Sequence, residues 1–261
     1  MEWKKVKWLI IALLLAVNIF LGISIAFKYT RAIRSEKESL TAAVELAKAS
    51  LGFTVDKFAH LPRYLYSYAG ERDMAAEAET ARSIVHGDIQ CTEAGGGVFI
   101  YNSPGTERVV FRRGGSVEGI VSADFEVNIT PCITRAAQNS GLETKTENGQ
   151  LSFYFLDRPI SNGFLSQDLF GEYVSLTATV PLSSDWQRQQ KCRSRGEMVL
   201  ALRNISEQYE LGELIKVEAV YYAEARAGTV LELIPAWQAE CSGGTVTVSL
   251  VDKTLLQSDF N

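Results

Sequence analysis

The sequence predicts an α+β fold in which one transmembrane helix precedes two units, each a helix packed on an antiparallel sheet. Three observations predict this fold. Residues 8–27 form an uncharged and almost wholly apolar run. Several later segments repeat apolar residues every three or four positions, which is typical of helices, and others alternate apolar and polar residues, which is typical of strands. Turns that contain glycine or proline separate the alternating segments.

The apolar run 8–27 is long enough to cross a membrane. Its twenty residues would span about 30 Å as a helix, the thickness of the hydrocarbon core. A cleaved signal peptide is the alternative, because lysines precede the run and Ser24-Ile25-Ala26 resembles a cleavage site. Since the apolar part of a signal peptide normally has only about 7 to 15 residues, the length favours an uncleaved anchor in the cell membrane.

Basic residues flank both ends of the run, so the positive-inside bias does not decide the orientation. Because long domains translocate largely regardless of flanking charge, we expect residues 1–7 in the cytoplasm and the large domain outside. The chain has 26 basic and 31 acidic residues, of which six basic and one acidic lie between its start and Arg34. The residues after Arg34 therefore have a formal net charge of −10. That charge argues against both nucleic acid and anionic lipid as partners of the domain.

A juxtamembrane helix is expected over residues 28–52, because five apolar residues share one helical face and Gly52 would end it. These five residues are Leu40, Ala43, Val44, Ala47 and Leu51. The first α+β unit is expected over residues 53–130. It begins with an extended stretch in which Tyr64, Tyr66 and Tyr68 alternate and continues with a helix over 73–86. Four short strands follow, over 88–92, 98–102, 107–112 and 117–122.

The second α+β unit is expected over residues 131–261. Helices are predicted over 133–141 and 196–209, because apolar residues recur there at intervals of three and four. Strands are predicted over 150–156 and 171–180, with an irregular connection between them. Three strands close the chain, and segments 215–224 and 246–250 show the alternation of a sheet with one covered face.

Several short motifs lie along the chain. They are Glu2-Trp3, Lys7 and Asn18-Ile19-Phe20-Leu21 near the amino terminus, the segment 156–162, and Leu233-Ile234-Pro235-Ala236-Trp237. These motifs are similar to those of the YycI family. YycI proteins regulate a cell-wall two-component system of Firmicutes. The resemblance implies a bitopic protein with PepSY-like units outside the cell, which contacts a membrane histidine kinase, often together with a sister protein called YycH.

One face of the apolar run is a candidate contact surface for a partner's transmembrane helix. Asn18, Gly22 and Ala26 are spaced by four residues and fall on one helical face. Small residues allow a second backbone to approach, and an asparagine within the membrane seeks a hydrogen bond. The alternative is a helix that faces lipid on all sides, with Asn18 tolerated there.

The four cysteines lie far apart without a CxxC pair, so a zinc site is not expected. In an oxidising exterior Cys91 could pair with Cys132, and Cys192 with Cys241; four thiols are the other alternative.

We expect no cofactor and no catalytic residues, because the chain has two histidines, His60 and His86, and neither lies in a recognisable catalytic motif. His86, at a predicted helix end, is interpreted as a favourable charge near the carbonyl terminus. The expected function is that of a non-catalytic regulator. The alternative is a PepSY-like binding module outside the cell that captures a peptide, a protease or a wall fragment.

Overall fold

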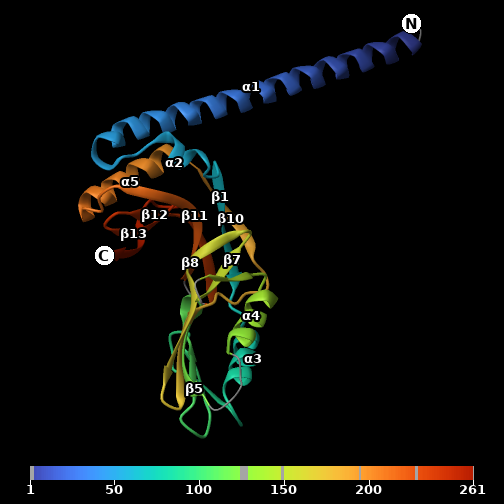
Figure 1. Ribbon diagram of the computed structural model, residues 1–261. Coiled ribbons are helices and arrows are strands. Elements are labelled where there is room, and N and C mark those ends of the chain that lie inside the picture. Colours follow the sequence, from blue (N-terminus) through green and yellow to red (C-terminus); the bar gives the residue numbers. More distant parts are fainter. Residues whose placement is uncertain (1–2, 124–128, 148–149, 194, 227–228, 261) are drawn as a thin grey trace.

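The computed structural model describes residues 3–123, 129–147, 150–193, 195–226 and 229–260, and Figure 1 shows them as a long helix attached to a curled sheet. Helix α1, Trp3–Leu51, has 49 residues and is therefore about 74 Å long. It contains both the predicted transmembrane helix and the predicted juxtamembrane helix without a break. Gly52 follows it with a φ of +63°, as the predicted end requires.

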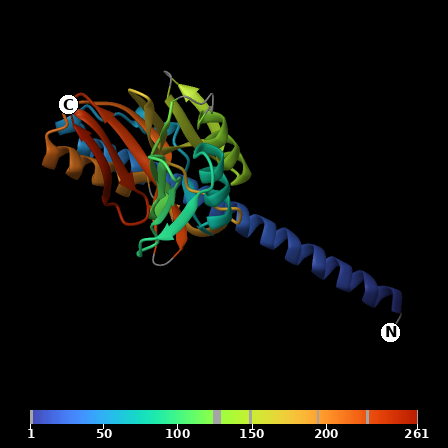
Figure 2. The same ribbon diagram turned by 90° about the horizontal axis from the view of Figure 1, so that it is seen from below.

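Helix α1 is long and apolar enough to span a membrane, and none of its most apolar window is buried against the rest of the protein. In Figures 1 and 2 its amino-terminal half projects freely, while its carboxy-terminal part lies along one end of the folded body. We call this body, residues 53–260, the head.

The described residues of the head form one continuous sheet of 14 strands. Its main path runs β10-β1-β12-β11-β8-β9-β5-β4-β3-β2; strands β13 and β14 extend it beside β12, and β7 and β6 extend it beside β8. The strands are β1 Tyr64–Glu71, β2 Gln90–Glu93, β3 Phe99–Asn102, β4 Arg108–Phe111, β5 Ser116–Ser122, β6 Glu143–Glu147, β7 Gln150–Phe155, β8 Arg158–Phe170, β9 Tyr173–Thr179, β10 Gln187–Arg193, β11 Leu214–Ala225, β12 Val230–Cys241, β13 Gly244–Ser249 and β14 Leu255–Phe260.

The neighbouring strands pair antiparallel, except where β8 meets β11. These two strands run parallel, with Tyr221 in register with Ile160. The expectation of purely antiparallel sheets was therefore wrong at this junction. Beside it the side chain of Asn162 bonds twice to Ala223: its amide nitrogen donates to the carbonyl at 2.8 Å, and its amide oxygen accepts from the N–H at 2.9 Å. This side chain adds to the short backbone pairing between the two strands.

Helices cover the sheet at two ends. The end of α1, helix α2 (Val55–Ala59) and helix α5 (Arg195–Tyr209) enclose one hydrophobic cluster, the α1–α5 core. It includes Leu40, Val44, Ala47, Phe58, Met198, Leu202 and Trp237. Helices α3 (Met74–Ile84) and α4 (Ile129–Asn139) enclose the other, the α3–α4 core. It includes Ile84, Phe111, Ile133, Phe153, Leu176 and Tyr221.

The helices expected over 73–86, 133–141 and 196–209 correspond to α3, α4 and α5. The predicted inner face of the juxtamembrane helix is confirmed for Leu40, Ala43, Val44 and Ala47, which are buried; the side chain of Leu51 lies outside the described residues. The irregular connection expected after residue 156 is instead strand β8. The division into units 53–130 and 131–261 stays a prediction. Helix α3 from the first of these segments and α4 from the second share one core.

Candidate functional site

The stripe of Asn18, Gly22 and Ala26 lies on the free half of α1. All three residues are exposed, and a Cβ built on Gly22 would meet no heavy atom within 4 Å. The head therefore leaves this face of the helix open. A second helix could approach it closely in a membrane.

The other half of α1 is held in the head by charge and by close packing. Glu36 lies 4.0 Å from Arg63, which precedes β1, and 3.5 Å from Arg195, which begins α5. Burial lowers the pKa of Arg195, and Glu36 opposes that shift. At Gly196 the backbone of α5 approaches α1 so closely that a Cβ there would lie 2.5 Å from the hydroxyl of Ser39. A displacement of α1 would therefore act directly on α5 and β1.

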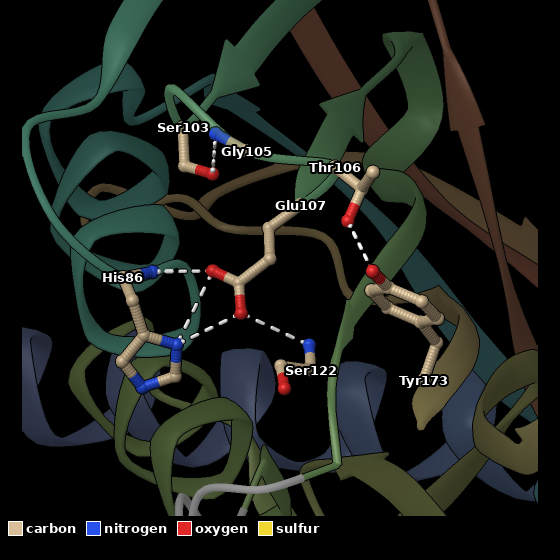
Figure 3. A network of polar contacts seen from close by, with 7 residues as sticks. All are labelled: His86, Ser103, Gly105, Thr106, Glu107, Ser122 and Tyr173. Carbon is tan, nitrogen blue, oxygen red and sulfur yellow. Dashed lines mark hydrogen bonds and ion pairs between the residues drawn. The ribbon is translucent and has the colours of Figure 1, made fainter. Parts of the chain in front are cut away.

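A network of polar contacts joins the end of α3 to the sheet (Figure 3). The carboxylate of Glu107, just before β4, accepts a hydrogen bond from the backbone N–H of His86 at 2.7 Å and lies 2.9 Å from Nδ1 of the same residue. The backbone N–H of Ser122, at the end of β5, donates to it at 3.0 Å. Beside this network the hydroxyl of Thr106 bonds to that of Tyr173 at 2.7 Å.

The carboxyl of Glu107 is buried, which by itself raises its pKa, but the hydrogen bonds from His86 and Ser122 outweigh burial and hold the pKa below its ordinary value. The pairing of a histidine with a carboxylate also occurs in acid–base catalysis. Here the bonds from His86 connect the end of α3 to the start of β4, and the bond from Ser122 connects the start of β4 to the end of β5. We therefore interpret the network as a connection within the fold. The expected favourable contact of His86 with the helix dipole stays a prediction.

A second buried pair holds the glycine triplet 95–97 against α3. The guanidinium of Arg72 donates to the carboxylate of Glu77 at 2.8 Å and to the carbonyl of Gly97. It also lies 5.1 Å from the ring centre of Phe99. Burial raises the pKa of Glu77 even though Arg72 favours the ionised carboxylate. The hydrogen bond from Arg72 to the carbonyl of Gly97 thus holds the triplet in its turn.

A polar groove of about 690 Å³ crosses the sheet. Its floor is the end of β11 and the start of β12, and its walls are the short helix η1 (Arg113–Gly115) and the turn between β13 and β14. Glu232 lies buried in it, 2.6 Å from Nε of the exposed Arg226. Burial raises the pKa of Glu232, while Arg226 opposes the shift. Because Ala223 and Leu233 point into the α3–α4 core, the groove lies on the opposite face of the sheet.

All four cysteines are free thiols in the structure. Cys91 is exposed on β2 and Cys132 half-buried on α4, while Cys192 and Cys241 are buried in the α1–α5 core. Burial raises the pKa values of Cys192 and Cys241. The structure thus has the cysteines as four thiols, which is one of the two alternatives, and disulfide pairing stays a prediction.

No protein-family model matches the chain, and no curated protein is significantly similar to it. Among solved structures, the chain is similar to an uncharacterised protein from Eubacterium rectale ATCC 33656. The match covers 76% of this chain and 82% of that one, at 10% sequence identity and a TM-score of 0.38.

Proposed function

We propose that this protein is a membrane-anchored, extracytoplasmic regulator of a cell-wall-related sensor histidine kinase. It acts by contact through α1 and the head, without chemistry of its own. Residues 1–7 lie in the cytoplasm and the head lies outside, folded as two PepSY-like units. The resemblance of short motifs to those of the YycI family supports the kinase as partner, and a YycH-like protein as a second partner.

The observation that carries this proposal is the unbroken course of α1. One half of the helix is exposed and apolar, and the other half is part of the α1–α5 core. Because no glycine or proline interrupts residues 23–51, a partner that binds the span would reposition the head as a rigid body. A helix with this arrangement suits transmission of a signal across a membrane.

Photo-crosslinking in native membranes tests the proposal. A crosslinker placed at position 18 should capture a membrane histidine kinase. The double variant Asn18→Leu/Gly22→Leu, with the crosslinker moved to position 26, should reduce that capture at least fivefold. Phe20→Leu/Ser24→Leu is the matched control, since it changes two residues of equal spacing about 200° around the helix. Equal capture by the two variants, or capture of no kinase, would contradict the proposal.

The polar groove favours a second candidate function, capture of a peptide, a protease segment or a wall fragment. Binding sites are concave and contain a few convergent polar groups, and the groove around Glu232, Arg113 and Arg226 has both properties. Titration of the full chain with peptide and wall-fragment mixtures tests it. Saturable binding that Arg113→Gln/Arg226→Gln weakens would support this function, and binding unaffected by the two changes would exclude the groove.

A further inference from the structure

The outer face of strands β1 and β10 carries two tyrosines and two basic residues in contact. We call Tyr64, Tyr66, Arg188 and Lys191 the basic–aromatic strip. The ammonium of Lys191 lies 3.7 Å from the ring centre of Tyr64, and the guanidinium of Arg188 lies 4.6 Å from that of Tyr66. The two rings meet edge to face with centres 5.8 Å apart. These contacts keep both cations aligned along one face.

At Tyr64 and Tyr66 this face points away from the α1–α5 core. Leu65 and Cys192 are paired across β1 and β10 and are both buried in the α1–α5 core. Since side chains alternate along a strand, Tyr64, Tyr66 and Lys191 lie on the opposite side of the sheet. Tyr64 is 47% exposed, so the strip is accessible.

The charge of the strip is opposite to that of the rest of the head. The chain beyond Arg34 has an acidic excess, yet β10 contains three basic residues and no acidic one. Among the described strands, β10 pairs with β1 alone and is an edge of the sheet. Basic side chains on an edge strand hinder strand addition, which accounts for the lysine and arginine but leaves the adjoining tyrosines unexplained.

Along the axis of α1, the strip lies near the end of the apolar run 8–27. Arg63, immediately before β1, and Arg195, shortly after β10, both contact Glu36 of α1. Glu36 follows Phe27 by nine residues, or about 14 Å along the helix. A headgroup layer extends about 5 to 8 Å beyond the hydrocarbon, and long basic side chains reach further towards it. Figures 1 and 2 show β10 on the side of the head towards which the free half of α1 projects.

We propose that the basic–aromatic strip binds the phosphate headgroups of anionic phospholipids in the same bilayer that holds α1. Arg188 and Lys191 meet the phosphates, and Tyr64 and Tyr66 lie at the depth where tyrosines are enriched. This inference rests on the membrane anchoring in the proposed function and adds a second contact. Two contacts fix the rotation of the head relative to the bilayer, which one helix alone does not.

The full chain in lipid nanodiscs tests this inference. The discs contain phosphatidylcholine with or without phosphatidylglycerol, together with a trace of phosphatidylglycerol that carries a photoactivatable headgroup. Labelling should fall in the peptides that contain 64–71 and 187–193. Arg188→Glu/Lys191→Glu should lower it at least fivefold. Arg108→Glu/Arg112→Glu makes the same charge change on two exposed residues, the first residue of β4 and the residue that follows β4, and should leave it unchanged.

A second probe in the lipid acyl chain reports separately whether residues 10–27 are in the bilayer. Acyl labelling without headgroup labelling of the strip would overturn this inference and leave the anchor intact, whereas loss of both would overturn the anchor as well. Equal labelling of the strip variant and the wild type would also overturn it, as would crosslinking of the strip to an acidic protein in native membranes. Matching denaturation midpoints confirm that both double variants are folded.

Discussion

Asn162 supplies with its side chain the two hydrogen bonds that a neighbouring strand would supply with its backbone. Asn162→Leu would leave the N–H and the carbonyl of the buried Ala223 unpaired. We expect it to lower the free energy of unfolding of the head by about 2 to 4 kcal/mol. Urea denaturation followed by tryptophan fluorescence measures this loss. The exposed amide Gln208 offers a control, since Gln208→Leu should change the stability by less than about 0.5 kcal/mol.

Asn162→Asp gives a second measurement at the same position. A carboxylate can accept from the N–H of Ala223 but cannot donate to its carbonyl. The variant should therefore be destabilised at pH 7 and partly recover when the carboxyl is protonated near pH 4. A variant as stable as the wild type at pH 7 would show that β8 and β11 do not depend on this side chain.

Glu107 should make the head less stable in acid. Its pKa is held below the ordinary 4.5 in the folded protein, so its ionised form stabilises the fold above pH 4.5, and that contribution is lost as the pH falls through the lower folded value. Glu107→Gln should cost about 1 to 3 kcal/mol at pH 7, because the amide group turns a donor towards His86 or Ser122.

The difference in unfolding free energy between wild type and Glu107→Gln, measured from pH 7 to pH 3, should shrink below pH 4.5. Glu93→Gln, at an exposed position, is the matched control. Its difference in unfolding free energy from the wild type should stay constant over this pH range. A difference that stays constant down to pH 3 would contradict the assignment of these hydrogen bonds.

Neither of these residue contacts could be predicted from the sequence. Asn162 lies in a segment that resembles a family motif, but its partner Ala223 is 61 residues away. The bonds of Glu107 likewise depend on where β4, β5 and α3 come together. A side chain's partner follows from the register of distant strands, and a local pattern does not contain that register.

At the scale of elements, Gly196 sets the distance between α5 and α1. An alanine normally stabilises a helix by about 1 kcal/mol relative to glycine. At Gly196 the added methyl would lie 2.5 Å from the hydroxyl of Ser39 and 3.1 Å from its carbonyl oxygen. Gly196→Ala should therefore destabilise the head by about 1 to 3 kcal/mol, and Ser39→Ala should restore part of the loss.

Thermal denaturation of the four proteins in a double-mutant cycle measures this coupling. Gly22→Ala is the control, because a methyl there has open space and should leave the head's stability unchanged. If Gly196→Ala stabilises the head, the two helices are not in the close contact described.

The elements that follow from local periodicity were predicted well, and those that depend on pairing were not. Helix α5 begins and ends within a residue of the predicted range, because its apolar residues recur every three or four positions. Strand β8 was missed, since Pro159, Asn162 and Gly163 are typical of loops. It is a strand because β7 and β9 bond to it on either side.

At the scale of the whole molecule, the two predicted helices before Gly52 proved to be one. The sequence contains no glycine, proline or turn motif between Phe27 and Gly52, so the continuity could have been inferred. What could not be predicted is that its buried end joins α5 in one core, because residues of α1 such as Leu40 and residues of α5 such as Met198 are more than 150 positions apart. Because of this core, a rotation of α1 about its own axis turns the head with it.

Insertions between Arg31 and Ala32 test whether that rotation matters. Two alanines turn the head by about 200° relative to the span, whereas a seven-residue helical insertion turns it by about 700°, which is within 20° of two full turns. If the protein regulates a kinase as proposed, the two-residue variant should lose its effect on kinase autophosphorylation in proteoliposomes, and the seven-residue variant should retain most of it. A flexible Gly-Ser insertion of seven residues should lose it too, because it breaks the rigid connection.

All three insertions leave the cores of the head intact, so the denaturation midpoints of the three variants should match that of the wild type. Equal kinase responses from the two-residue and seven-residue variants would show that the head does not act through a fixed orientation on α1.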